Sequence, residues 1–135
     1  MRVVIITGSR HWARQPPIAA AIAAADMVMH GGARGADEVA DRVARSLSLD
    51  RLVMPAHWAD AGAAAGPQRN ERMAARAAAL AAEGHEVQCF AFPLPDSVGT
   101  WDCVERMRKH GIPVTVYRHE QWRAAGEDPL EDERG

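Results

Sequence analysis

The chain opens with a continuous apolar run, Val3-Val4-Ile5-Ile6-Thr7, which ends at Gly8. β-Branched residues without polar alternation are typical of a strand that is buried on both faces, as in a parallel sheet. Strands of this kind need helical crossover connections. The run therefore predicts a central strand of an α/β sheet.

Strand-like and helical segments alternate along the rest of the chain. Further strands are expected at 27–30, 52–54, 87–92 and 113–117, and helices at 18–25, 36–47, 69–83 and 99–110. In the second helix we expect the apolar positions to face inward, namely Val39, Ala40, Val43, Ala44 and Leu47. This order predicts a Rossmann-like three-layer α/β/α sandwich with a mostly parallel sheet of about five strands.

The length of 135 residues is enough for one domain with one core. We assign that domain to residues 1–118. A polar acidic tail is expected at 119–135, where Glu127, Asp128, Glu131, Asp132 and Glu133 gather. A formal net charge of -2 argues against general electrostatic binding of duplex nucleic acid.

Cys89 and Cys103 are the only cysteines, and their spacing fits neither zinc binding nor a redox pair. We expect both to be reduced thiols. The histidines are scattered without metal-ligand spacing, so no metal or other cofactor is expected. No signal segment or membrane-spanning apolar stretch is recognised, which indicates a cytoplasmic protein without a membrane partner.

A glycine-rich segment, His30-Gly31-Gly32-Ala33-Arg34-Gly35-Ala36-Asp37, connects the second strand to the second helix. Glycines let backbone amides approach a ligand closely, and a helix N-terminus attracts anions, so this segment predicts a phosphate-binding loop. A tight strand-to-helix turn would also explain its glycines. It is neither a P-loop nor a full G-x-G-x-x-G fingerprint.

Other polar segments are expected at the same carboxyl edge of the sheet, where parallel sheets bind ligands. Gly8-Ser9-Arg10 follows the first strand, where it is an anion site or an ordinary turn. Gly99-Thr100 opens the last helix, where Thr100 is an N-cap or a phosphate ligand. Arg69, Asn70 and Arg72 fall in the first turn of the predicted third helix. A basic first turn opposes the helix dipole, which favours a functional role.

The stretch 55–67 is expected to be a long irregular loop that forms a wall of the site. His57 and Trp58 in this stretch either contact a nucleobase or pin the loop to the core. Asp37, Asp102 and Glu105 stand in early helical turns. There they either stabilise the helix or act as acids or bases, and helix stabilisation is the preferred interpretation for Asp37 and Glu105.

Four segments together resemble a known superfamily: Val4-Ile5-Ile6-Thr7-Gly8-Ser9-Arg10, His30 to Asp37, Ala65-Gly66-Pro67-Gln68-Arg69-Asn70 and Gly99-Thr100. They resemble the SLOG superfamily, and within it the YspA-like, YpsA-related branch of bacterial and phage proteins, a domain of unknown function (DUF2493). The resemblance covers roughly residues 2–117. It implies a Rossmann-like fold with a pocket for nucleotides or nucleotide derivatives.

The resemblance extends distantly to the LOG phosphoribohydrolases and to the DNA-processing protein DprA. LOG enzymes cleave a base from a nucleoside monophosphate with a P-G-G-x-G-T-x-x-E motif, of which Gly99-Thr100 is the matching part here. Cys103 stands at the position of the motif's catalytic glutamate, one residue after Asp102. If hydrolysis occurs, the resemblance implies that Asp102 or Glu105 stabilises an oxocarbenium-like centre while Arg69 holds the phosphate.

The leading expectation is therefore a module that binds or senses a nucleotide-like small molecule. The alternatives are a LOG-like N-glycosidic hydrolase and DprA-like binding of single-stranded DNA. Binding of single-stranded DNA is disfavoured by the negative net charge and by the presence of only four tryptophans and one tyrosine. Apolar, alanine-rich helix faces are compatible with a homo-oligomer and equally with close helix-on-sheet packing.

Overall fold

The computed structural model describes residues 1–95 and 97–118, so the acidic tail predicted at 119–135 lies outside the described residues. Its sheet has five strands in the order β3-β2-β1-β4-β5, and all of the pairs are parallel. The strands are β1 (Arg2–Gly8), β2 (Met27–His30), β3 (Asp50–Val53), β4 (Glu86–Phe92) and β5 (Val114–Val116). The prediction that the first apolar run forms the central strand is confirmed.

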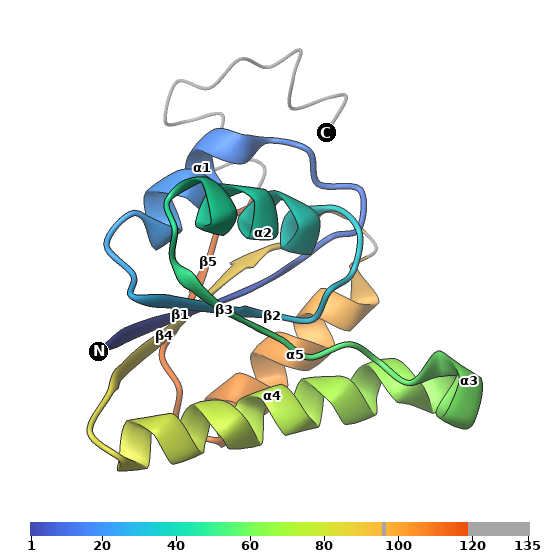
Figure 1. Cartoon of the computed structure of the whole chain (residues 1–135). Helices are drawn as coiled ribbons and strands as arrows, with labels where there is room; N and C mark the ends of the chain where they lie inside the picture. Colours follow the sequence, from blue (N-terminus) through green and yellow to red (C-terminus); the bar gives the residue numbers. More distant parts are fainter. Residues whose placement is uncertain (96, 119–135) are drawn as a thin grey trace.

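Helices cover both faces of this sheet (Figure 1). On one face lie α1 (Gln15–Ile22) and α2 (Ala36–Ser46), and on the other lie α4 (Ala65–Ala82) and α5 (Val98–Lys109). A short helix α3 (Trp58–Ala61) and a 3-10 turn η1 (Gly62–Ala64) lead into α4. The protein is therefore a Rossmann-like α/β/α sandwich, as predicted.

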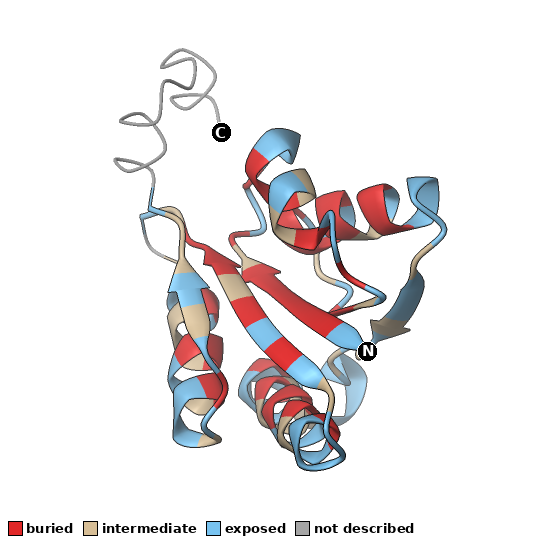
Figure 2. Cartoon of the chain, turned by 90° about the vertical axis from the view of Figure 1, so that its left-hand side faces the viewer, coloured by how far each residue is buried: buried red, intermediate tan, exposed pale blue. Residues whose placement is uncertain are grey.

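Side chains of β1 alternate between two core layers. Val4 and Ile6 pack on the side of α1 and α2, whereas Val3 and Ile5 pack on the side of α4 and α5. Because both faces are covered, all four are at most 2% exposed, and Figure 2 shows the buried centre of the sheet between its helices. Replacing such a buried isoleucine by alanine costs about 2–5 kcal/mol.

The prediction of a long irregular loop at 55–67 is wrong. Most of this stretch is helical, and α4 begins at Ala65, four residues before the predicted start. From the sequence Pro67 is predicted to be a loop residue, yet it stands in the first turn of α4. Backbone N–H groups in a first turn have no intrahelical acceptor, so the missing N–H of proline removes no hydrogen bond there. Arg69 is consequently the fifth helical residue, and the argument from a basic first turn does not apply to it.

The apolar face of α2 differs from the prediction at one position. Val39, Ala40, Val43 and Ala44 are buried, but Leu47 is the C-cap residue and is 49% exposed. The helix ends one residue earlier than expected, so the helical periodicity no longer turns Leu47 toward the core. No helix within the described residues is long and apolar enough to cross a membrane.

Candidate functional site

The strand order changes direction beside the central strand. From β1 the chain adds β2 and β3 on one side, then crosses the other face of the sheet and places β4 on the free side of β1. The loops after β1 and β4 therefore lead to helices on opposite faces, α1 and α5 (Figure 1). Ligands of open α/β sheets bind in the crevice at such a switch point.

The loop after β1 lies against the loop after β2. The backbone amide of Ala36 donates to the carbonyl of Ser9 at 3.1 Å. Gly35 has φ +78°, and a Cβ on it would stand 2.6 Å from Cα of Arg10. At Gly8 a Cβ would stand 2.6 Å from that of Ala36. Both glycines are thus required by the close approach of the two loops.

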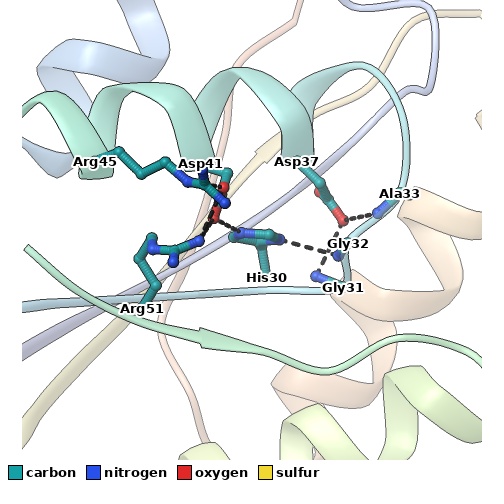
Figure 3. Close-up of polar contacts among 8 residues, drawn as sticks. All are labelled: His30, Gly31, Gly32, Ala33, Asp37, Asp41, Arg45 and Arg51. Carbon is teal, nitrogen blue, oxygen red and sulfur yellow. Dashed lines mark hydrogen bonds and ion pairs between the residues drawn. The ribbon is translucent and has the colours of Figure 1, made fainter.

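The glycine-rich loop binds an internal carboxylate. Asp37 accepts hydrogen bonds from the amides of Gly31 at 3.0 Å and Ala33 at 3.3 Å, and the amide of Gly32 donates to Nδ1 of His30 at 3.0 Å (Figure 3). Three amides that we expected to be available for a phosphate therefore donate to groups of the protein. Within this loop the position expected for the anion is taken by the carboxylate of Asp37.

Burial makes the charge of Asp37 costly. The side chain is 5% exposed, and desolvation raises its pKa, an effect only partly offset by His30, the loop amides and Arg69. Helix stabilisation, the interpretation preferred from sequence, does not account for these contacts, because the carboxylate points into the loop rather than toward solvent.

Arg69 and Asn70 join the glycine-rich loop to both helices of the opposite face. Arg69 donates from Nη1 to the carbonyl of Gly31 at 2.6 Å and from Nε to Oδ1 of Asn70 at 2.9 Å. The amide of Asn70 donates to the carbonyl of Gly99 at 3.2 Å and to Asp102 at 2.9 Å. The structure therefore brings together the separate segments that the sequence had indicated.

The two acidic residues considered for catalysis differ in placement. Burial opposes ionisation of Asp102, but hydrogen bonds from Arg106 and Asn70 outweigh it and hold the pKa of the carboxyl below its usual range. Asp102 is therefore an ionised hydrogen-bond acceptor at neutral pH. Glu105 is exposed, pairs with Lys109 at 3.5 Å and does not join the cluster.

Several candidate residues still present polar groups outward. Arg10 and Arg34 are exposed, and neither has a hydrogen bond or ion pair within the part of the chain that the structure describes. Thr100 is not the N-cap of α5, because Ser97 occupies that position and Thr100 is the third helical residue, 4% exposed. Nothing lies within 4 Å of the place where Gly99 would carry a Cβ.

Trp58 stands at the start of α3 and is 60% exposed. Its ring approaches α4, since Cη2 would lie 3.3 Å from a Cβ on Gly66. The indole rests on the first turn of α4 instead of entering the core, so one face of it is available to a ligand.

Sequence analysis missed a second polar cluster on the far side of the glycine-rich loop. His30, Arg45 and Arg51 converge there on the carboxylate of Asp41 (Figure 3). The only sequence signal is the i,i+4 spacing of Asp41 and Arg45, which is equally typical of any exposed helix face.

The thiols and acidic groups give no metal centre in the described residues, where no three His, Cys, Asp or Glu side chains are grouped closely enough. Cys89 and Cys103 are buried free thiols. Burial raises the pKa of Cys103 to about 11 and raises that of Cys89 well above its usual value, so both thiols are protonated. Cys103 is thus an inert thiol.

The strand order and the polar edge of the sheet define a Rossmann-like α/β protein. The chain is 40% identical over 126 residues to the Gene 61 protein of Mycobacterium phage D29, an alignment that covers 84% of this chain and 94% of the phage protein. The chain therefore belongs to the family of that phage protein. No family model and no solved structure matches it.

Proposed function

We propose that the protein binds a nucleotide or nucleotide derivative at the carboxyl edge of the sheet, beside the loops after β1 and β4, as a binding or sensing module. The observation that carries this proposal is the convergence of four segments distant in sequence. Gly31, Asn70 and Gly99 are joined through Arg69 in one hydrogen-bonded cluster at the switch point of the sheet. Ser9 contacts the same glycine-rich segment by accepting the amide of Ala36. The resemblance to the SLOG superfamily supports the same ligand class.

Arg10 and Arg34 are the groups that we assign to the ligand's phosphate. Each carries a full set of guanidinium donors that no described residue uses, and a guanidinium matches the geometry of phosphate oxygens. The N-terminus of α5, at Gly99 and Thr100, adds the positive end of a helix dipole. The exposed indole of Trp58 offers a stacking surface to the base.

Binding without hydrolysis is favoured by the residues beside Thr100. The buried Cys103 replaces the glutamate of the LOG motif, and Asp102 is already engaged by Asn70 and Arg106. A carboxylate held by two donors is a weaker stabiliser of a developing cation. We keep a cytoplasmic location as part of the proposal, because nucleotides are abundant there.

Titration calorimetry with AMP, ATP and ADP-ribose tests the proposal. We expect at least one of them to bind, and Arg10→Ala and Arg34→Ala each to weaken binding about 10- to 100-fold, since a hydrogen bond to a charged group contributes about 1.5–3 kcal/mol. Arg76→Ala is the matched control, because Arg76 is an exposed arginine of α4 without a partner in the described residues.

Failure of all three compounds to bind, with an unchanged melting temperature, would refute the proposal, since a ligand at a hundred times its Kd stabilises by about 2.7 kcal/mol. Chromatography of the same mixtures separates binding from hydrolysis. Release of free base that is lost in Asp102→Asn would establish the hydrolase instead. Mass spectrometry of small molecules that co-purify with the wild type but not with Arg34→Ala would identify the ligand.

A further inference from the structure

A second polar cavity, of about 500 Å³, lies between α2 and the edge strand β3. It is lined by His30, Gly32, Ala33, Glu38, Asp41, Arg42, Arg45, Arg51 and Val53. This volume is within the range of about 300–1,000 Å³ that small-molecule sites have. Arg10, Arg69, Asn70 and Gly99 do not line it, so the cavity is distinct from the crevice of the proposed function and shares only the glycine-rich loop with it.

Asp41 anchors two arginines at this cavity. Its carboxylate lies 2.9 Å from Nε of Arg45 and 2.8 and 3.0 Å from Nη1 of Arg51 (Figure 3). Burial opposes ionisation of Asp41, but the bonds from Arg51 and His30 outweigh it and lower its pKa to about 2. The carboxylate is therefore charged throughout the physiological pH range and holds both guanidinium groups in place.

His30 connects this anchor to the loop. Its Nε2 lies 2.8 Å from Asp41, and its Nδ1 lies 3.0 Å from the amide nitrogen of Gly32. A backbone amide can only donate, so Nδ1 is the acceptor and the ring proton is on Nε2, facing Asp41. His30 is 2% exposed. The wall of the cavity is thus held rigid by hydrogen bonds at both ring nitrogens.

The arginines of the cavity keep unused donors. Arg45 uses only Nε and Arg51 only Nη1, while Arg42 is exposed without a hydrogen bond or ion pair in the described part of the chain. Of the two acids, Asp41 is surrounded by these donors, and Glu38 accepts the amide of Gly35 at 3.1 Å. Three guanidinium groups therefore face two occupied carboxylates, which leaves one net positive charge.

We infer that this cavity is a second anion site, which binds the phosphate or diphosphate group of a small molecule through Arg42, Arg45 and Arg51. Arginine suits this task because its remaining N–H groups form parallel bonds to two phosphate oxygens. Preorganisation by Asp41 and His30 lowers the conformational entropy lost on binding. The exposed side of Val53, 39% accessible, gives the rest of the molecule an apolar contact.

The test is titration calorimetry with inorganic diphosphate and with ADP, at low ionic strength and without phosphate buffer. The double variant Arg42→Ala/Arg45→Ala removes two exposed side chains and leaves Arg51 on Asp41, so a melting curve close to that of the wild type is expected. We expect this variant to weaken diphosphate binding at least 10-fold. The control variant is Arg76→Ala, which should stay within twofold of the wild type. Arg10→Ala/Arg34→Ala is titrated beside it, to separate anion binding at the site of the proposed function from binding in the cavity.

The following outcomes would overturn the inference. Absence of diphosphate binding, or equal loss in Arg76→Ala, would leave no specific site in the cavity. Loss in Arg10→Ala/Arg34→Ala without loss in Arg42→Ala/Arg45→Ala would assign the anion to the crevice, in support of the proposed function alone. Retardation of single-stranded DNA that Arg42→Ala/Arg45→Ala abolishes would assign the phosphate to nucleic acid.

Discussion

The contact between the loops after β1 and β2 can be tested at one glycine. Gly35 has φ +78°, and a Cβ there would collide with the backbone of Ser9 and Arg10. Gly111, after α5, has the same φ of +78°, but nothing lies within 4 Å of its Cβ position. Alanine at Gly111 meets only the cost of a positive φ. At Gly35, where ψ is −123°, alanine also enters a backbone region that L residues avoid and displaces a neighbouring loop.

The expected magnitudes differ accordingly. A left-handed backbone conformation destabilises the folded state by about 1–2 kcal/mol when the residue is alanine. The alanine variant also has a less flexible unfolded chain, which offsets about 0.4–1 kcal/mol of that loss. Gly111→Ala should therefore destabilise by about 1 kcal/mol. Gly35→Ala adds the displacement of rigid backbone, about 1–3 kcal/mol by analogy with an overpacked core, for a total of about 2–4 kcal/mol.

Urea denaturation followed by circular dichroism measures both free energies of unfolding. The difference between the variants should reach at least about 1 kcal/mol, or about 3–5 °C in melting temperature for a domain of this size. If Gly35→Ala is no less stable than Gly111→Ala, the two loops are not packed as described, and the convergence that carries the proposed function is refuted with it.

Three further predictions concern single side chains. Asn70→Ala should destabilise by about 1–3 kcal/mol in urea titrations, because Asn70 is 5% exposed and its side chain bonds Arg69, Asp102 and the Gly99 carbonyl, whereas Glu105→Ala should change stability by less than about 0.5 kcal/mol; similar losses would contradict the assigned roles. The folded pKa of Asp41, about 2, lies below its ordinary 3.8, so its contribution is complete above about pH 4 and is lost as the pH falls toward 2. After allowance for solvent screening this is about 1 kcal/mol, and Asp41→Asn should show correspondingly less acid destabilisation between pH 5 and 2.5 than the wild type; an unchanged pH profile would argue against the network. Acrylamide should quench the fluorescence of wild type more strongly than that of Trp58→Phe, since Trp58 is 60% exposed while Trp12 is 2% exposed; equal quenching would place Trp58 in the core.

Much of the architecture follows from local patterns. The β-branched run at the N-terminus predicts the central strand because a strand covered on both faces requires apolar residues at every position. Gly84 and Gly111, the glycines that follow α4 and α5, adopt positive φ and end those helices, as glycine after a helix commonly does. The pattern was misleading at Pro67, because one proline is compatible with both a loop and the first turn of a helix.

By itself, then, the sequence determined the alternation of strands and helices, the central place of β1 and the edge of the sheet where the polar segments meet, since hydrophobic period and turn chemistry are local properties. Only the tertiary structure decided what those polar groups do. The sequence already places Asp37 in the first turn of a helix. Whether its carboxylate faces solvent or the amides of Gly31 and Ala33 depends on the course of the loop that precedes the helix. Likewise His30, Asp41 and Arg51 come from a strand, a helix and the next strand, and hydrogen bonds of 2.8 Å between them exist only because the packing of α2 on the sheet sets those distances.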